Sequence, residues 1–171
     1  MILFWRETQD GSFSAQDLRP AGAAAGVHAA APLHAGAGPG GVRLAERGAR
    51  RNDLCIGAWQ GSRLGGYLIV RFCGRSAHNY AAFMDVPRTE WEHWANADSA
   101  IVHADFRGNG LQRLMLEAAL PLFPKKITHI GATVSPQNQY SLHNALASGF
   151  AIVSRREMYG GHDRYLLAKE L

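Results

Sequence analysis

The chain has 171 residues, 47% of them hydrophobic and 19% charged, which suits one globular domain and argues against disorder. The net charge of +4 favours a polyanionic ligand, but it is too small and scattered to indicate a nucleic-acid partner. Cys55 and Cys73 form no C-x-x-C, so neither a disulfide framework nor a metal site is expected. The sequence contains no apolar run long enough for a membrane span. We therefore expect one domain over residues 1–171, located in the cytoplasm.

The first fifty residues carry weak structural signals. Residues 1–8 have the pattern of an opening strand, and residues 14–18 that of a helix start. From 21 to 51 the chain turns to Ala, Gly, Pro and Arg, and glycine recurs too often for a stable helix. Two interpretations stay open for this segment: a flexible, weakly packed cover, or a local slip of the reading frame in the encoding DNA.

The pattern becomes regular after residue 53. Residues 54–72 read as two strands joined by a turn, which predicts a hairpin. A longer insertion follows over residues 73–97, with a short helix predicted at 88–94. Trp91 and Trp94 lie on one face of that helix, where they either pack against the sheet or form a wall of the acceptor pocket.

A glycine turn joins the next strand to a helix. The β-prone residues 100–102 lead into the turn at 107–110, and apolar residues at helical spacing begin at Leu111. Glycines in a strand-to-helix turn let the backbone approach an anion closely, and the first N–H groups of the helix are free to bind it. The turn is neither a Walker loop nor a dinucleotide fingerprint, because it lacks a Gly-Lys pair and the third glycine. It predicts a phosphate-binding loop.

The rest of the chain continues the strand-and-helix pattern. Residues 127–134 predict a buried strand. Ser135 is placed to cap a helix with Pro136 at its first position, and Gly149 to end that helix in the left-handed conformation. Residues 151–169 predict a closing hairpin around a Gly-Gly turn.

Two of these segments resemble motifs of the GNAT acetyltransferase superfamily. The first, Arg107-Gly108-Asn109-Gly110-Leu111-Gln112, is similar to the acyl-CoA pyrophosphate loop [Q/R]-x-x-G-x-[G/A]. Gln112 departs from it, since Gly or Ala is usual there. Its side chain would either crowd the pyrophosphate or bend away and donate a hydrogen bond to it.

The second motif lies about 30 residues later. Asn138, a small residue three positions on, and Gly149-Phe150 resemble N-x-x-[AS]-x-x-L-Y-x-K-x-G-[FY]. Covering residues 53–171, the resemblance implies the α/β (α+β) fold of acyl-CoA N-acyltransferases. In this fold helices flank a mixed, mostly antiparallel central sheet, and a splayed parallel strand pair forms the cofactor site.

The same resemblance implies a function. An enzyme of this kind moves an acetyl group from acetyl-CoA, its co-substrate, to a primary amine by direct transfer in a ternary complex. The acceptor would be a small-molecule or peptide amine, with a protein lysine also open, and the protein could form a homodimer. Two alternatives stay open: a catalytically weak or inactive CoA-binding module of the same fold, and a generic phosphate-binding protein. Ala145 favours the inactive module, since the family usually has a tyrosine there.

The resemblance assigns the cofactor to the strand before the loop, to the loop itself and to the start of the next helix. In this chain these residues are Ile101, Val102, His103, Arg107, Gly108, Asn109, Gly110, Leu111, Gln112, Asn138 and Ser141.

Three residues are candidates for proton transfer. Asp98, expected at the start of the strand, and His103, at its end, are candidate bases. Asp98 could equally be a strand-entry turn residue, and His103 a structural or cofactor-contacting one. Tyr140 is a substitute acid, although by helical spacing it points about 140° away from position 145.

Overall fold

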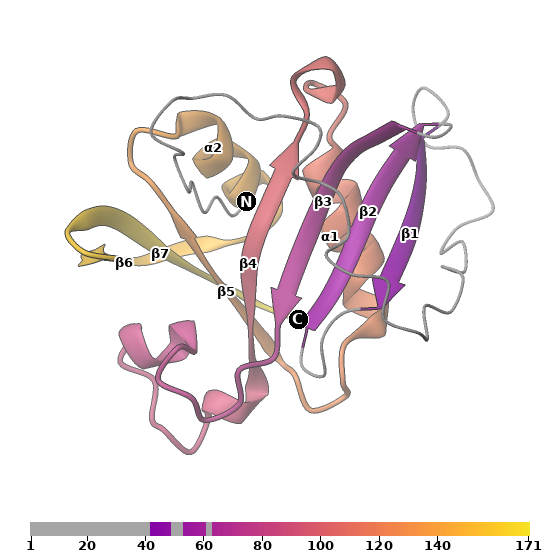
Figure 1. Ribbon diagram of the computed structural model, residues 1–171. Helices are drawn as coiled ribbons and strands as arrows, with labels where there is room; N and C mark the ends of the chain where they lie inside the picture. The colour runs from indigo at the N-terminus through magenta and orange to yellow at the C-terminus, as the bar shows by residue number, and fades with distance from the viewer. Residues whose placement is uncertain (1–41, 49–52, 61–62) are drawn as a thin grey trace.

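The computed structural model describes residues 42–48, 53–60 and 63–171, with side chains described from residue 53 onward. Over these ranges the chain forms a seven-stranded sheet with two α-helices, in the strand order β1-β2-β3-β4-β5-β7-β6 (Figure 1). The strand predicted at residues 1–8 and the helix start predicted at 14–18 lie outside the described residues. In the described part, no helix is both long enough and apolar enough to cross a bilayer.

The described elements lie along the chain as follows. The strands are β1 (Val42–Gly48), β2 (Asp53–Gln60), β3 (Arg63–Arg71), β4 (Trp94–Val102), β5 (His129–Val134), β6 (Ala151–Met158) and β7 (His162–Glu170). Among the described residues, the α-helices are α1 (Leu111–Ala119) and α2 (Gln139–Ala147), and the short 3₁₀ helices are η3 (Tyr80–Phe83), η4 (Trp91–His93), η5 (Ala104–Phe106) and η6 (Leu120–Leu122).

The sheet is mixed, because β4 and β5 run parallel while every other neighbouring pair is antiparallel. This confirms the predicted fold class, and the β2–β3 and β6–β7 pairs confirm the two predicted hairpins. The sequence did not predict β1, which lies within the segment 21–51. Val42 and Leu44 alternate with polar residues, but the strand is completed by pairing with β2, which the local pattern does not reveal.

Two apolar clusters cover the two faces of the sheet. On one face α1 buries Leu111, Met115 and Leu116 against β2, β3 and β4, while its Arg113 and Glu117 form an exposed ion pair. This arrangement follows from the helical spacing of apolar residues. On the other face lie η3 and η4, and residues of the sheet strands join them in a cluster that contains Tyr80, Ala81, Met84, Trp94, Met158 and Leu166.

The insertion before β4 ends earlier than predicted. The helix expected at 88–94 is only the 3₁₀ turn η4, and Trp94 already belongs to β4. Trp94 is buried and Trp91 packs beside it, so the packing interpretation of the two tryptophans is confirmed. The strand starts at Trp94 because its first residues pair with β5, an interaction that lies far away in the sequence.

A glycine of β3 provides the space for the segment after β4. The Cβ of any other residue at Gly65 would lie 2.5 Å from the Phe106 ring, and the Gly65 carbonyl accepts a hydrogen bond from the His103 N–H at 2.9 Å. Phe106 is the buried residue of η5. Gly65 therefore determines how closely the segment between β4 and α1 packs on the sheet.

We predict that Gly65→Ala lowers the free energy of unfolding by about 1–3 kcal/mol, because the added methyl overpacks against Phe106. Chemical denaturation measures this change. In the double variant Gly65→Ala/Phe106→Ala the methyl has room, so its loss of stability should be smaller than the sum of the two single losses. Additive losses would contradict this contact.

Candidate functional site

The parallel strands β4 and β5 separate partway along their length. Their paired residues run from Trp94 and His129 to Ala97 and Ala132, yet β4 continues to Val102 and β5 to Val134. Figure 1 shows the two ribbons diverging beyond the paired segment. The sheet is therefore open at this point, although β4 stays paired with β3 up to Val102.

The backbone of β4 determines which groups face this opening. His103 donates its N–H to the Gly65 carbonyl of β3, so that group is already used. Because backbone groups alternate along an antiparallel strand, those of Ile101 also face β3. The groups of Ala100 and Val102 face the opening instead. Of Ile101, Val102 and His103, which were predicted to offer backbone groups to a cofactor, only Val102 has backbone groups on the side of the opening. Ala100, which was not named in that prediction, has them there as well.

Asp98 lies in the middle of β4, not at its start as predicted. Ile69 pairs with Ser99 and Val70 with Ala97, so Asp98 is the extra residue of a β-bulge. Its side chain is 17% exposed and lies 3.5 Å from the Arg71 guanidinium. Burial raises the pKa of the Asp98 carboxyl, and Arg71 and the Ser99 hydroxyl offset part of this rise.

The loop after β4 forms a concave backbone surface at the start of α1. Gly108 and Gly110 have φ of +80° and +65°, which favours glycine, and a Cβ at either position would meet nothing within 4 Å. Gly110 is the N-cap of α1, and no side chain caps the helix. The first N–H groups of a helix attract anions. The predicted phosphate loop thus has the open backbone that a pyrophosphate needs.

Gln112 bends away from the loop. Its Oε1 accepts a hydrogen bond from Asn144 Nδ2 of α2 at 3.1 Å. In this position the side chain links α1 to α2, and the larger residue at the last motif position does not fill the space above Gly108 and Gly110.

His103 takes a structural position at the loop. It is the N-cap of η5, where its Nδ1 accepts from the Asp105 N–H at 3.3 Å. Its side chain is 55% exposed and lies 3.7 Å from the Asp105 carboxylate. His103 therefore has a structural role as the N-cap of η5, which is one of the two interpretations that the sequence left open for it, the other being a contact with the cofactor.

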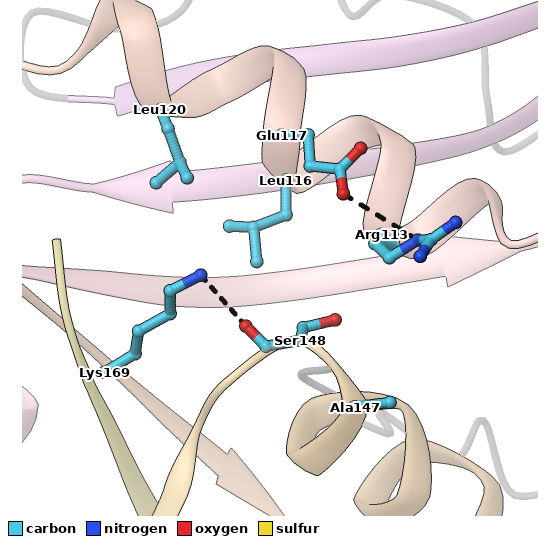
Figure 2. A pocket seen from close by; sticks show the side chains of 7 residues that line it. All are labelled: Arg113, Leu116, Glu117, Leu120, Ala147, Ser148 and Lys169. Atoms are coloured by element: carbon cyan, nitrogen blue, oxygen red, sulfur yellow. Dashed lines mark hydrogen bonds and ion pairs between the residues drawn. The ribbon is translucent and has the colours of Figure 1, made fainter.

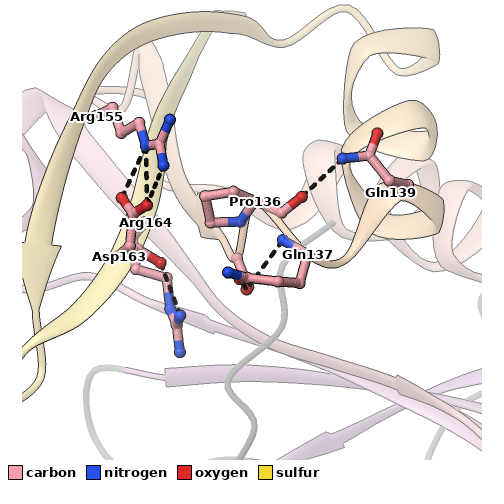
Figure 3. Close-up of polar contacts among 7 residues, drawn as sticks. Pro136, Gln137, Gln139, Arg155, Asp163 and Arg164 are labelled. Carbon is pink, nitrogen blue, oxygen red and sulfur yellow. Dashed lines mark hydrogen bonds and ion pairs between the residues drawn. The ribbon is translucent and has the colours of Figure 1, made fainter.

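The second predicted helix starts later than expected. Ser135 and Pro136 form a turn whose carbonyl at Pro136 accepts from Gln139 Nε2 at 2.7 Å (Figure 3), and Asn138 is the N-cap. The Asn138 Oδ1 accepts from the Ser141 N–H at 2.9 Å. Asparagine competes well with serine for this cap. Gly149 ends the segment with φ of +85°, as predicted.

Two residues of α2 differ strongly in exposure. Tyr140 is 88% exposed on the surface of the helix, whereas Ser141 is 2% exposed. Ala145 is completely buried in the apolar cluster, so the place of the family tyrosine is packed against the core.

Three residues that the sequence analysis missed lie on the face of the sheet opposite α1. Tyr159 Oη lies 3.3 Å from Thr133 Oγ1 and 3.3 Å from Tyr80 Oη. Thr133 is the first residue of β5 beyond its pairing with β4. Asp98 is near enough to raise the pKa of both tyrosines, although burial is the main cause.

Tyr159 also has an unusual backbone. Its φ of +53° is uncommon for a bulky residue and costs about 1–2 kcal/mol. The following Gly160 and Gly161 were the only signal in the sequence, and they indicated a turn. The hydroxyl contacts of Tyr159 arise from pairing distant strands, which a local pattern does not predict.

A small cavity lies elsewhere, between α1, the end of α2 and β7 (Figure 2). Its volume is about 160 Å³, and it is lined by Arg113, Leu116, Glu117, Leu120, Ala147, Ser148 and Lys169. Ligand pockets usually measure about 300–1,000 Å³. Lys169 Nζ donates to the Ser148 carbonyl across it at 2.9 Å. This cavity is too small for acetyl-CoA, and we place the candidate site at the opening between β4 and β5.

The described residues contain no group of three or more His, Cys, Asp or Glu side chains that could hold a metal ion. The groups that the structure places at or near the opening are backbone donors, the partly buried carboxyl of Asp98 and the hydroxyls of Tyr80 and Tyr159.

No protein-family model and no curated protein matches the sequence. The fold, in contrast, is similar to that of several solved structures. An acetyltransferase of the GNAT family from Streptococcus pneumoniae has a TM-score of 0.53 at 20% identity, covering 70% of this chain and 68% of that one. The ribosomal-protein-S18-alanine N-acetyltransferase from Escherichia coli has a TM-score of 0.53 at 17% identity, covering 71% of each chain.

A third similar structure contains the co-substrate. It is a putative streptothricin acetyltransferase from Bacillus anthracis in complex with acetyl coenzyme A, with a TM-score of 0.56 at 11% identity, covering 72% of this chain and 65% of that one. At these identities the comparisons establish the fold, which is that of GNAT acetyltransferases.

The partly buried carboxyl of Asp98 leads to a prediction about stability. Because burial raises its folded-state pKa, the fold favours the protonated form, and the wild type loses stability as pH rises through that pKa. Relative to Asp98→Asn, the free energy of unfolding of the wild type should fall as pH rises from the ordinary pKa of an aspartate to the raised folded-state pKa. Denaturation across this range measures the difference.

Asp163 provides a control, because its pKa is shifted in the direction opposite to that of Asp98. Hydrogen bonds from Arg155 lower its pKa, so its contribution to stability is present above the unfolded pKa and is lost as pH falls. Relative to Asp163→Asn, the wild type should therefore gain stability as pH rises. If the free energy of unfolding changes with pH in the same direction in both comparisons, burial does not disfavour the charged form of Asp98.

Proposed function

We propose that this protein, which has the GNAT acetyltransferase fold, transfers an acetyl group from acetyl-CoA directly to a primary amine. The observation that carries the proposal is the end of β4–β5 pairing after Ala97 and Ala132, beside a left-handed glycine loop at the start of α1. An open strand edge next to an anion-binding loop suits a ligand with both an amide-containing arm and a pyrophosphate.

The loop and the strand would hold different parts of acetyl-CoA. The N–H groups around Gly108, Asn109 and Gly110, with those of Leu111 and Gln112, suit the pyrophosphate, and the exposed Arg107 adds positive charge. The backbone of Ala100 and Val102 suits the amides of the pantetheine arm. Asn138 would contribute its Nδ2, since its Oδ1 already caps α2.

The chemical step needs a neutral amine. An amine of pKa about 10.4 is mostly protonated at pH 7, a handicap of roughly 4.6 kcal/mol. In the proposed step the nitrogen bonds to the acetyl carbon, the carbon–sulfur bond breaks, and the Asp98 carboxylate takes the proton of the amine. The raised pKa of Asp98 makes it a stronger base than an exposed aspartate. Of the two candidate bases, Asp98 is preferred over His103, which caps η5.

The departing thiolate needs little assistance, but a proton donor is available. Tyr159 lies at the opening, and burial raises the pKa of its hydroxyl, so it stays protonated at neutral pH. Tyr140 points into solvent and is the weaker candidate. Ala145 leaves the usual tyrosine position without an acid.

The glycine loop is tested by a matched pair of variants. Gly110→Ala should weaken acetyl-CoA binding by at least about tenfold, because the left-handed backbone costs about 1 kcal/mol and the methyl enters the cradle. Gly74 also has positive φ and open space around its Cα, but lies outside the site. Gly74→Ala should lose similar stability and keep its affinity in titration calorimetry. Equal affinities for the two variants would argue against the loop.

The general base is tested by turnover. In a thioester-loss assay with a panel of primary amines, Asp98→Asn should lower kcat/KM by about 10²–10⁴-fold. The control is Asp53→Asn, because Asp53 contacts the same Arg71 guanidinium, at 3.9 Å. This control should retain the wild-type kcat/KM. A wild type that binds acetyl-CoA tightly but acetylates no amine would favour the alternative, an inactive CoA-binding module, to which the buried Ala145 lends some support.

A further inference from the structure

Arg164 of β7 is a buried arginine that has no carboxylate partner among the described residues. The residue is only 8% exposed, and within the described part of the chain its Nε has no hydrogen-bond partner. Its Nη1 donates to a backbone carbonyl, that of Asp163, at 2.9 Å. The two arginines of the neighbouring strand differ, since Arg155 pairs with Asp163 and Arg156 pairs with Asp85.

The guanidinium of Arg164 lies on the same side of the sheet as the phenol pair. Successive residues of a strand point to opposite faces, and Figure 3 shows the Arg164 side chain extending away from the Arg155–Asp163 pair. Its Cζ lies 5.9 Å from the centre of the Tyr159 ring. The Tyr159 hydroxyl in turn contacts Thr133, which borders the opening between β4 and β5. Only the Tyr159 side chain therefore lies between Arg164 and the edge of the opening.

A buried charge costs free energy unless an opposite charge compensates it. The nearest carboxylate along the chain, Asp163, points to the other face and is held by Arg155. The guanidinium is a planar fork that matches a carboxylate with two parallel hydrogen bonds. The Arg164 guanidinium, which lacks a carboxylate among the described residues, is thus complementary to a carboxylate brought by a ligand.

We propose that Arg164 recognises a carboxylate of the acceptor, so that the substrate is a small molecule with both a primary amine and a carboxylate. This inference rests on the acetyl transfer proposed above. The amine is directed to Asp98 at the opening, and the carboxylate is held beside Tyr159. The arrangement selects amino acids of a suitable length over amines without negative charge.

The test compares matched acceptors. The probes are glycine, β-alanine, 4-aminobutyrate, 6-aminohexanoate and lysine, each paired with its carboxamide. For the preferred length, the wild type should show at least about a tenfold higher kcat/KM for the acid than for the carboxamide, since tenfold is a modest discrimination for a charge-assisted pair. In Arg164→Met this ratio should fall to near one, and in Arg164→Lys to an intermediate value.

The control variant is Arg75→Gln, which removes an exposed arginine paired with Glu92. It should keep the wild-type ratio. If the wild type uses carboxamides as well as acids, or if Arg164→Met keeps the preference, the proposal is overturned.

A binding measurement separates this proposal from the acetyl transfer itself. With CoA present, the preferred amino acid should raise the melting temperature of the wild type and not that of Arg164→Met. Without ligand, Arg164→Met should melt at or above the wild-type temperature, because it removes an uncompensated buried charge. Should Arg164→Met not fold, Arg164→Lys carries the same comparison. If the protein binds the amino acid but does not acetylate it, the proposed acetyl transfer is contradicted and the carboxylate site at Arg164 is supported. If it acetylates amines without preferring the acid, the acetyl transfer is supported and the carboxylate site is contradicted.

Discussion

The architecture of the site depends on one constraint in the sheet, the loss of pairing between β4 and β5 after Ala97 and Ala132. A β-bulge at Asp98 accompanies it on the other side of β4. A bulge bends its strand and increases the local twist, which directs the end of β4 away from β5. The sheet gives up several hydrogen bonds here, and the exposed backbone of β4 becomes available to a ligand.

The surrounding elements place different chemistry on the two sides of this opening. Gly65 lets Phe106 pack closely, and this contact positions the glycine loop at the start of α1. On the opposite face, the hydroxyls of Thr133, Tyr159 and Tyr80 form a polar group. The buried guanidinium of Arg164 lies beside the Tyr159 ring. A polyanionic ligand suits the loop, and an acceptor suits the polar group. The bulge also sets the position of Asp98, whose carboxyl is near enough to this polar group to contribute to the raised pKa of both tyrosines.

Local signals in the sequence predicted the loop and the hairpins, because glycine turns and strand alternation are encoded by adjacent residues. Features set by pairing between distant strands were missed or misplaced. Asp98 was expected at a strand entry, yet it is a bulge that depends on β3. Ser135 was expected to cap α2, but the N-cap of that helix in the structure is Asn138. Arg164 and Tyr159 gave no signal, since their significance lies in burial and in contacts across the sheet.

Hydrogen exchange along β4 tests most directly whether the opening receives the pantetheine arm. The comparison is between acetyl-CoA and adenosine 3′,5′-bisphosphate, which lacks that arm. We expect acetyl-CoA to slow exchange of the Ala100 and Val102 amides, and the bisphosphate to leave them unchanged. If acetyl-CoA protects the loop at Gly108 and Gly110 but leaves those two amides exchanging at their free rate, the arm does not enter the opening and the proposed site is wrong.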